Sequence, residues 1–411
     1  MIPDTEPERA REIMLDFARL TRLEPAGEHP RRYLWTDAFA VCNFLELFRL
    51  TGDEAFRDLA LRLVDQVHHT LGRYRDDDRR IGWISGLGGK DGEKHPTIGG
   101  LRIGKRLPER RRGEPPDERL EWDQDGQYFH YLTRWMHALH QVSRATGDPV
   151  YNRWAMELAR TAHAKFTYDL PGGGRKGMYW KMSTDLTYPL VTAMGQHDPL
   201  DGLVIFCELR LAATADREPP ARVGLETEIA EMAGICRGMG LVTDDPLGTG
   251  GLLADALWIA QMMTRDAARQ RGSPGATRDF AMLLGKILPA ALEGLDSFAV
   301  SGCLNLPAGH RLAFRELGLA IGLLGLQRLD RLINGNPGLF GSENALRMQI
   351  EALVAYAPLG EAITGFWIDC RNRESPSWTE HREINMVMLA TALAPEGYLG
   401  TPAEKTKKRA G

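Results

Sequence analysis

The fold is decided by a helical hairpin that the chain contains twice: WTDAFAVCNFLELFRLTGDEAFRDLALRLVDQV at residues 35–67 and HYLTRWMHALHQVSRATGDPVYNRWAMELARTA at residues 130–162. In each copy an amphipathic helix meets a Thr-Gly-Asp turn, and a second amphipathic helix follows. The turn combines a glycine that stops one helix with an aspartate that caps the next. Helical hairpins bury their apolar faces by stacking on one another. The sequence therefore predicts a stacked or closed α-helical array.

Amphipathic segments continue along the whole chain, whereas strand-like alternation is nearly absent. We expect helices near residues 7–22, 35–50, 53–71, 125–145, 149–166, 199–213, 225–239, 250–266, 278–295, 311–331, 343–356 and 381–393. Two long connections, 73–123 and 167–197, are rich in Gly, Arg, Pro and aromatic residues. Ordered loops of this length usually serve function, so we expect them to form walls or lids of a pocket. We expect one domain over 1–400, followed by a basic, frayed tail at 401–411.

Composition excludes several classes of function. The 411 residues include 51 basic and 55 acidic side chains, and this near balance argues against a general nucleic-acid binder. No segment approaches the roughly 20 continuous apolar residues that a membrane span needs, and the charged N-terminal segment does not resemble a signal peptide. The five cysteines are odd in number and widely spaced, which favours reduced thiols in the cytoplasm.

The two Thr-Gly-Asp hairpins, within about a dozen expected helices, resemble the (α/α)6 toroid of the six-hairpin glycosidase superfamily. This superfamily includes glycoside hydrolases, unsaturated glucuronyl hydrolases and the N-acylglucosamine 2-epimerase group. The resemblance implies an all-α toroid of six hairpins. It also implies an active site built from the starts of the inner helices and the loops before them. A small-molecule carbohydrate is the implied partner, and no cofactor is implied.

The expected helix starts are rich in carboxylates and aromatic rings. Glycosidic bond hydrolysis uses one carboxyl group as acid and another as base or nucleophile, while aromatic faces stack on sugar rings. The catalytic candidates are Asp123, Asp125, Asp198, Asp201 and Glu380. The substrate-binding candidates are Trp35, Asp37, Trp122, Gln127, Tyr128, Trp180, His197, His310, Trp378, His381 and Arg382.

Each candidate also has a purely structural interpretation. Aspartate at a helix start caps free amides, and this explains Asp198 before Pro199 as well as Asp37 in a first turn. Asp123 and Asp125 cannot both cap one helix, so at least one of them is a candidate for facing substrate. Glu380 can close a local network with His381 or Arg382. Tryptophan at any of these positions can serve packing alone.

Other motifs carry less chemistry. His130, His137 and His140 share one side of a predicted helix, but no zinc-binding spacing accompanies them, and we expect no metal. The glycine-rich run at 85–92 fails the phosphate-loop pattern and is interpreted as a flap. A basic run follows it, and such runs are usually solvated, although on a pocket loop they can clamp an anionic substrate group. The run comprises Arg102, Lys105, Arg106, Arg110, Arg111 and Arg112.

Three classes of function follow. A glycoside hydrolase would pair Asp123 or Asp125 with Asp198, Asp201 or Glu380, and an anionic sugar is one candidate for its substrate. A sugar epimerase or isomerase would instead use His197 with His381 or His310 for proton transfer. A non-catalytic helical scaffold would have a plugged mouth and an exposed apolar patch. We favour the hydrolase, and the density of Trp, Asp and His at helix starts ranks the scaffold last.

Overall fold

The computed structural model describes residues 5–27, 29–213, 224–268, 274–340 and 344–400. The expected tail at 401–411 lies outside these residues. The chain forms two compact units, the first comprising Met1–Leu241 with Glu380–Ala390 and the second Val242–Thr379 with Thr391–Gly411. No helix in the described ranges is long and apolar enough to cross a membrane.

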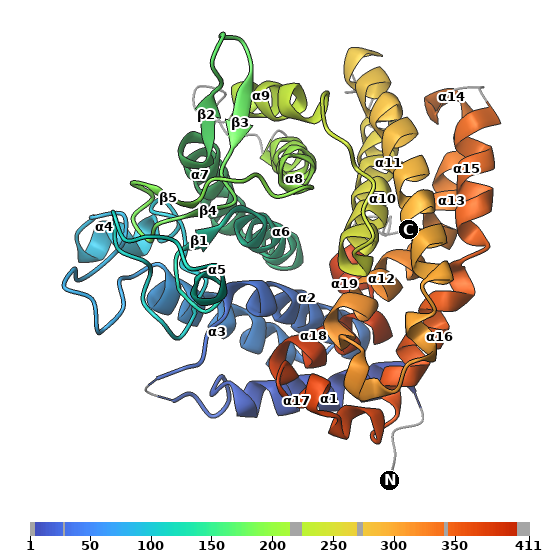
Figure 1. Cartoon of the computed structure of the whole chain (residues 1–411). Coiled ribbons are helices and arrows are strands. Elements are labelled where there is room, and N and C mark those ends of the chain that lie inside the picture. The colour runs from blue at the N-terminus through green and yellow to red at the C-terminus, as the bar shows by residue number, and fades with distance from the viewer. Residues whose placement is uncertain (1–4, 28, 214–223, 269–273, 341–343, 401–411) are drawn as a thin grey trace, which may run out of the picture. The chain divides into compact units, whose positions relative to one another are not determined.

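The first unit is built from helical hairpins (Figure 1). After α1 (Glu6–Leu20), these are α2 (Leu34–Thr51) with α3 (Glu54–Leu71), α6 (Phe129–Thr146) with α7 (Pro149–Phe166), and α8 (Asp198–Ala213) with α9 (Glu226–Cys236). The helices α2, α6 and α8 pack in series. Every residue of α2 from Leu34 to Leu47 is buried, whereas α3 buries one face only. A helix buried over most of its length lies inside the packing, whereas a helix that buries one face lies at its outside.

The repeated turn has the predicted structure in both hairpins. Gly52 and Gly147 end α2 and α6 in the left-handed region, at φ 71° and 76°. The carboxylates of Asp53 and Asp148 then accept the amide hydrogens of Ala55 and Val150 at the starts of α3 and α7. A glycine after one helix and an aspartate before the next thus make a tight antiparallel connection.

The two long connections contain structure that the sequence did not indicate. The first holds α4 (Gly89–Lys94) and α5 (Glu118–Glu121). The second forms a hairpin of β2 (Thr167–Asp169) with β3 (Lys176–Met178), and the strands β4 (Lys181–Met182) and β5 (Pro189–Val191). The strand β1 (Gln127–Tyr128), just before α6, completes a sheet of order β1-β4-β5. Segments of two or three residues are too short to show alternation.

The second unit is also helical. It contains α10 (Pro246–Ala268), α11 (Pro274–Val300), α12 (Ala313–Leu324), α13 (Leu326–Gly335), α14 (Pro337–Phe340), α15 (Asn344–Val354), α16 (Ala357–Ile368), α17 (Pro376–Thr379) and α19 (Glu396–Leu399). The helix α18 (Arg382–Leu393) contributes residues to both units.

Two expectations in this part of the chain were wrong. The single helix expected over 311–331 is divided at Gly325, a residue of low helix propensity. The helix α16 was missed because its sequence, APLGEAITGFWI, is apolar nearly all round and shows no helical period.

Candidate functional site

Five rings meet where α6 begins, and we call Trp122, Tyr128, His130, Tyr131 and Trp180 the aromatic cluster. Trp180 lies at its centre, with ring centroids 5.4 Å from Trp122, 5.4 Å from Tyr128 and 6.2 Å from His130. The β1–β4 pairing explains this position, because Tyr128 lies opposite Lys181, the residue after Trp180. The two long connections therefore supply one ring each to the start of an inner helix.

The cluster is partly open to solvent. The Trp122 side chain is 55% exposed, and Trp180 and His130 are half-buried. Tyr128 is buried, with the ammonium of Lys181 5.2 Å from its ring centroid. That ammonium donates to the carbonyl oxygens of Glu121 and Gln124, which fixes the loop below the rings. The cluster thus presents accessible aromatic surface on a rigid support.

Asp198, the first residue of α8, borders this cluster. One of its carboxylate oxygens, Oδ1, lies 3.6 Å from Nδ1 of His130. The other, Oδ2, is buried and accepts no hydrogen bond from any described residue. Gly195 packs against the carboxyl group so closely that a Cβ there would lie 2.5 Å from it. A buried acceptor without a donor is costly, and such groups recur at functional sites.

Asp123 follows Trp122 in the chain and is exposed, and none of the described residues makes a hydrogen bond or ion pair with its carboxylate. The half-buried Lys105 interacts electrostatically with Asp123. Burial lowers the pKa of the Lys105 ammonium, and the negative charge of Asp123 opposes this shift. The Lys105 ammonium lies 5.2 Å from the ring centroid of Tyr33, and the Tyr33 hydroxyl lies 2.6 Å from that of Tyr131. A cation and an anion therefore flank the cluster.

The other carboxylates near these helix starts have strong partners. Asp125 is fully buried, binds Arg102 at 2.5 Å and accepts the amide hydrogen of Gly104 at 3.0 Å. Asp201 accepts from Arg134 through both oxygens, at 3.0 and 3.1 Å.

Asp37 is also buried, and it accepts the amide hydrogen of Tyr33 at 3.0 Å. Burial raises the pKa of this carboxyl to about 6, against the opposing charge of Arg32. These bonds hold backbone and helix ends in place.

The remaining sequence candidates are dispersed. Gln127 is buried and bonds the backbone of Gly99, Leu101 and Thr184. Trp35 packs on Phe39, and in the second unit Trp378 is buried and stacked on Trp367. His197 contacts the carbonyl oxygen of Leu241 at 2.8 Å. The exposed His310 ends a short 3-10 helix of the second unit, and Glu380, His381 and Arg382 precede or begin α18.

Sequence reasoning missed several residues of this site. His130 was considered only for metal binding or packing, and Tyr33, Tyr131 and Lys181 were not considered at all. Their positions beside Trp35, beside His130 and after Trp180 were the available signal. His137 and His140, the other two members of that histidine group, lie against Glu208, at 3.2 and 3.7 Å. The described residues contain no cluster of three or more His, Cys, Asp or Glu side chains suited to a metal ion.

The basic run separates into structural and accessible members. Arg102 is buried on Asp125, and Arg110 pairs with Glu121 at 3.1 Å. Arg106 and Arg112 are exposed, and Arg111 lies 4.0 Å from Glu114. Of the six, Lys105 is the residue whose ammonium lies over the ring of Tyr33, and the Tyr33 hydroxyl contacts that of Tyr131 in the aromatic cluster.

Comparison with known proteins identifies the fold. No family profile and no curated protein sequence matches the chain. Among solved structures, the GH76A α-1,6-mannanase of Salegentibacter sp. HEL1_6 is similar with a TM-score of 0.51 and 13% identity, covering 95% of this chain and 99% of that one. An inactive variant of that enzyme in complex with α-1,6-mannotriose gives a TM-score of 0.50 and 12% identity over the same shares.

The cellobiose 2-epimerase of Spirochaeta thermophila DSM 6192 has a TM-score of 0.45 and 15% identity, over 94% of this chain and 98% of that one. The expected all-α fold class is confirmed by the likeness to the mannanase. The chain has an (α/α)6 toroid fold similar to that of the mannanase.

Proposed function

We propose that this protein is a carbohydrate-active enzyme, most specifically a glycoside hydrolase that uses Asp123 and Asp198. The observation that carries the proposal is a partly exposed aromatic cluster with two carboxylates that no strong protein partner neutralises: Asp198 lies beside His130, and Asp123 follows Trp122 in the chain. Fold likeness to a mannanase supports the same class of substrate. Fold alone does not decide function, so the assignment rests on the site.

The two carboxylates suit different roles. Asp198 is shielded from water beside His130 and is assigned as the proton donor to the leaving oxygen. Asp123 is reached by water and is assigned as the base that activates it. Asp125 and Asp201, which are held by arginines, are assigned to positioning the loop and α8. Glu380 is the reserve candidate for the second carboxylate because it is exposed before α18.

The substrate is a saccharide whose ring stacks on Trp122 or Trp180. α-1,6-Mannosides are the first probes, because a fold neighbour was solved with mannotriose. Lys105 adds a second hypothesis, that the sugar carries a carboxylate or phosphate. A half-buried ammonium beside a ring surface attracts an anion more strongly than a fully solvated one. Neutral, uronate-bearing and phosphorylated oligosaccharides should therefore be compared.

Product mass tests the reaction directly. We would incubate the protein with this panel and compare it with Asp123→Asn, Asp198→Asn and a control, Asp58→Asn, which alters an exposed carboxylate on α3. Hydrolysis adds one water per bond cleaved, and we expect a loss of about 100-fold or more in both site variants but not in the control. Full activity in both site variants would refute the assignment.

An epimerase is the second candidate, and the His130–Asp198 contact at 3.6 Å favours it. An imidazole beside a carboxylate can remove and return a proton at a sugar carbon. In that case, NMR in D2O would show deuterium entering one carbon position while no bond is hydrolysed. His130→Gln would abolish this exchange. Deuterium exchange without hydrolysis would replace the hydrolase proposal with this one.

A further inference from the structure

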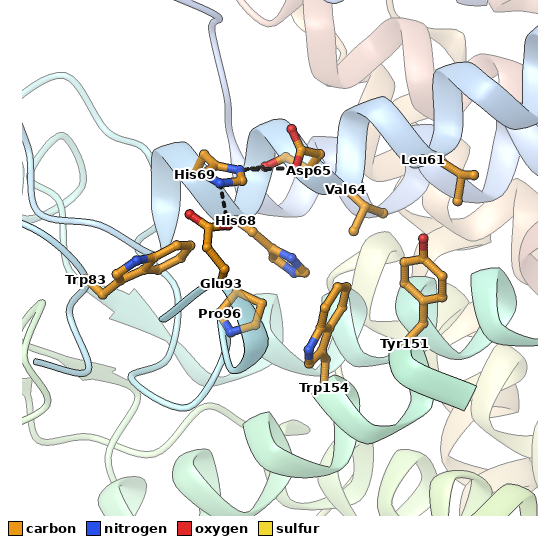
Figure 2. Close-up of a pocket in the computed structure, with 10 residues that line it drawn as sticks. All are labelled: Leu61, Val64, Asp65, His68, His69, Trp83, Glu93, Pro96, Tyr151 and Trp154. Atoms are coloured by element: carbon orange, nitrogen blue, oxygen red, sulfur yellow. Dashed lines mark hydrogen bonds and ion pairs between the residues drawn. The ribbon is translucent and has the colours of Figure 1, made fainter. Parts of the chain in front are cut away.

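We propose a second saccharide-binding site on the first unit, in a partly open pocket with a cavity volume of about 100 Å³ between α3, α4 and α7 (Figure 2). It contains none of the residues of the aromatic cluster or of the proposed acid pair. The inference goes beyond the proposed function, since binding here requires no catalysis.

The pocket has an apolar floor and aromatic walls. Leu61, Val64 and His68 lie three and four residues apart, so they share one face of α3. Tyr151 and Trp154 of α7 stand opposite them in Figure 2, and Trp154 makes edge contacts with both His68 and Tyr151. Flat aromatic surface of this kind matches the apolar face of a sugar ring.

Hydrogen bonds hold this shape without a ligand. The indole N–H of Trp154 donates to the carbonyl oxygen of Lys94 at 2.8 Å, and the Thr97 hydroxyl donates to the carbonyl oxygen of Trp154 at 2.8 Å. His95 contacts Glu157 of α7 at 2.7 Å. The segment that follows α4 is therefore fastened to α7. A preformed site avoids part of the ordering cost of binding.

His68 supplies a defined donor at the centre of the pocket. Its Nε2 accepts the indole N–H of Trp135 at 3.2 Å, and burial lowers the pKa of the imidazole to about 3. The neutral ring therefore carries its proton on Nδ1. No described residue accepts that proton, and His68 faces the pocket in Figure 2. A hydroxyl group of a ligand is a suitable acceptor.

Two carboxylates supply acceptors at one end. His69 lies between them, with Nδ1 3.2 Å from Asp65 and Nε2 2.8 Å from Glu93 (Figure 2). Each carboxylate keeps a second oxygen for a ligand hydroxyl. None of the described residues that line the pocket is Lys or Arg, and its two carboxylates disfavour an anionic ligand. Ring faces with hydrogen-bond donors and acceptors fit a neutral saccharide.

Fluorine NMR of protein labelled with 5-fluorotryptophan tests the site, because each of the nine tryptophans gives its own signal. Substitution of Trp154 or Trp122 by Phe assigns the two signals that report on the pocket and on the aromatic cluster. We would titrate with maltose, cellobiose and α-1,6-mannobiose, and with choline as a cationic competitor. We expect at least one disaccharide to shift the Trp154 signal in a saturable way, with a Kd on the order of 1 mM.

Variants locate the binding. Tyr151→Ala should weaken the Trp154 response about 10-fold, and Asp65→Ala should weaken it a few-fold, since both remove pocket contacts. Asp58→Asn on the same helix and Trp122→Ala in the cluster are matched controls that should leave it unchanged.

Three results would overturn the inference: no saccharide shifts the Trp154 signal, choline alone shifts it, or the response survives in both pocket variants. A response of Trp122 without one of Trp154 would overturn this site while leaving the proposed function intact. A response of Trp154 in a protein that hydrolyses nothing would support the pocket and count against the hydrolase.

Discussion

The aromatic cluster of the first unit and the start of α12 in the second unit both combine aromatic rings with charged side chains, yet these side chains differ in their hydrogen-bond partners. Before α12, Arg311 binds both oxygens of Glu316, and the Trp367 indole N–H donates to Glu316 at 2.8 Å. Every charge there is matched. At the cluster, Asp123 is exposed and Asp198 keeps a buried oxygen without a donor. A count of hydrogen-bond partners therefore separates the two regions where composition does not.

The largest effect on stability should come from a substitution at the start of α12. Glu316→Ala would leave the buried Arg311 guanidinium and the Trp367 indole without their acceptor. We expect the free energy of unfolding to fall by ~3–5 kcal/mol, as measured by urea denaturation. The comparison variant is Asp198→Asn, which should change stability by less than ~1 kcal/mol because the buried Oδ2 of Asp198 accepts no hydrogen bond from the described residues. Equal losses in the free energy of unfolding would show that both regions contribute equally to stability, which would contradict this comparison.

The tryptophans of the two regions should differ almost as much. Trp378 is 4% exposed and stacked on Trp367, so Trp378→Ala should cost about 3 kcal/mol or more in stability. Trp122 is 55% exposed, and Trp122→Ala should instead leave the melting temperature nearly unchanged and weaken saccharide binding about 10-fold. Thermal denaturation and ligand titration of both variants would reveal any reversal of this order.

Asp37 predicts a pH effect on stability. Burial raises the pKa of its carboxyl from 3.8 to about 6 in the folded protein, so the folded state binds more protons between these values. Stability contributed by the protonated group should be lost as pH rises through this window, by roughly 2–3 kcal/mol in total. Asp37→Asn should flatten this part of the stability profile relative to the natural chain. An unchanged slope between pH 4 and pH 6.5 would rule out this role for Asp37.

The smallest effect concerns two aspartates that lie two residues apart. Asp123→Asn should change the free energy of unfolding by no more than ~0.5 kcal/mol, since none of the described residues pairs with its carboxylate. Asp125→Asn, which weakens the Arg102 bond and alters a buried acceptor, serves as the positive control for destabilisation. Denaturation of both variants under one set of conditions is the measurement. A larger loss of stability for Asp123→Asn than for Asp125→Asn would contradict the assignment of Asp125 to structure and of Asp123 to catalysis.

The sequence predicted the fold more fully than the site. Periodicity and the Thr-Gly-Asp turns gave the hairpins because both signals are local. The cluster depends on Trp180, which the short β1–β4 pairing brings beside Tyr128 over a long separation in the chain. The two strands are too short for their sequence pattern to predict that pairing. The sequence also could not distinguish Asp123 from Asp125, because Arg102 reaches Asp125 through the fold of the intervening loop.

The most direct test of the proposed function measures kcat/KM of Asp123→Asn and Asp198→Asn on any oligosaccharide that the protein hydrolyses, together with their free energies of unfolding. We predict that each variant loses about 100-fold or more in kcat/KM while its stability stays within ~1 kcal/mol of the natural chain. Activity retained in both folded variants would contradict the assignment of the acid pair at the aromatic cluster.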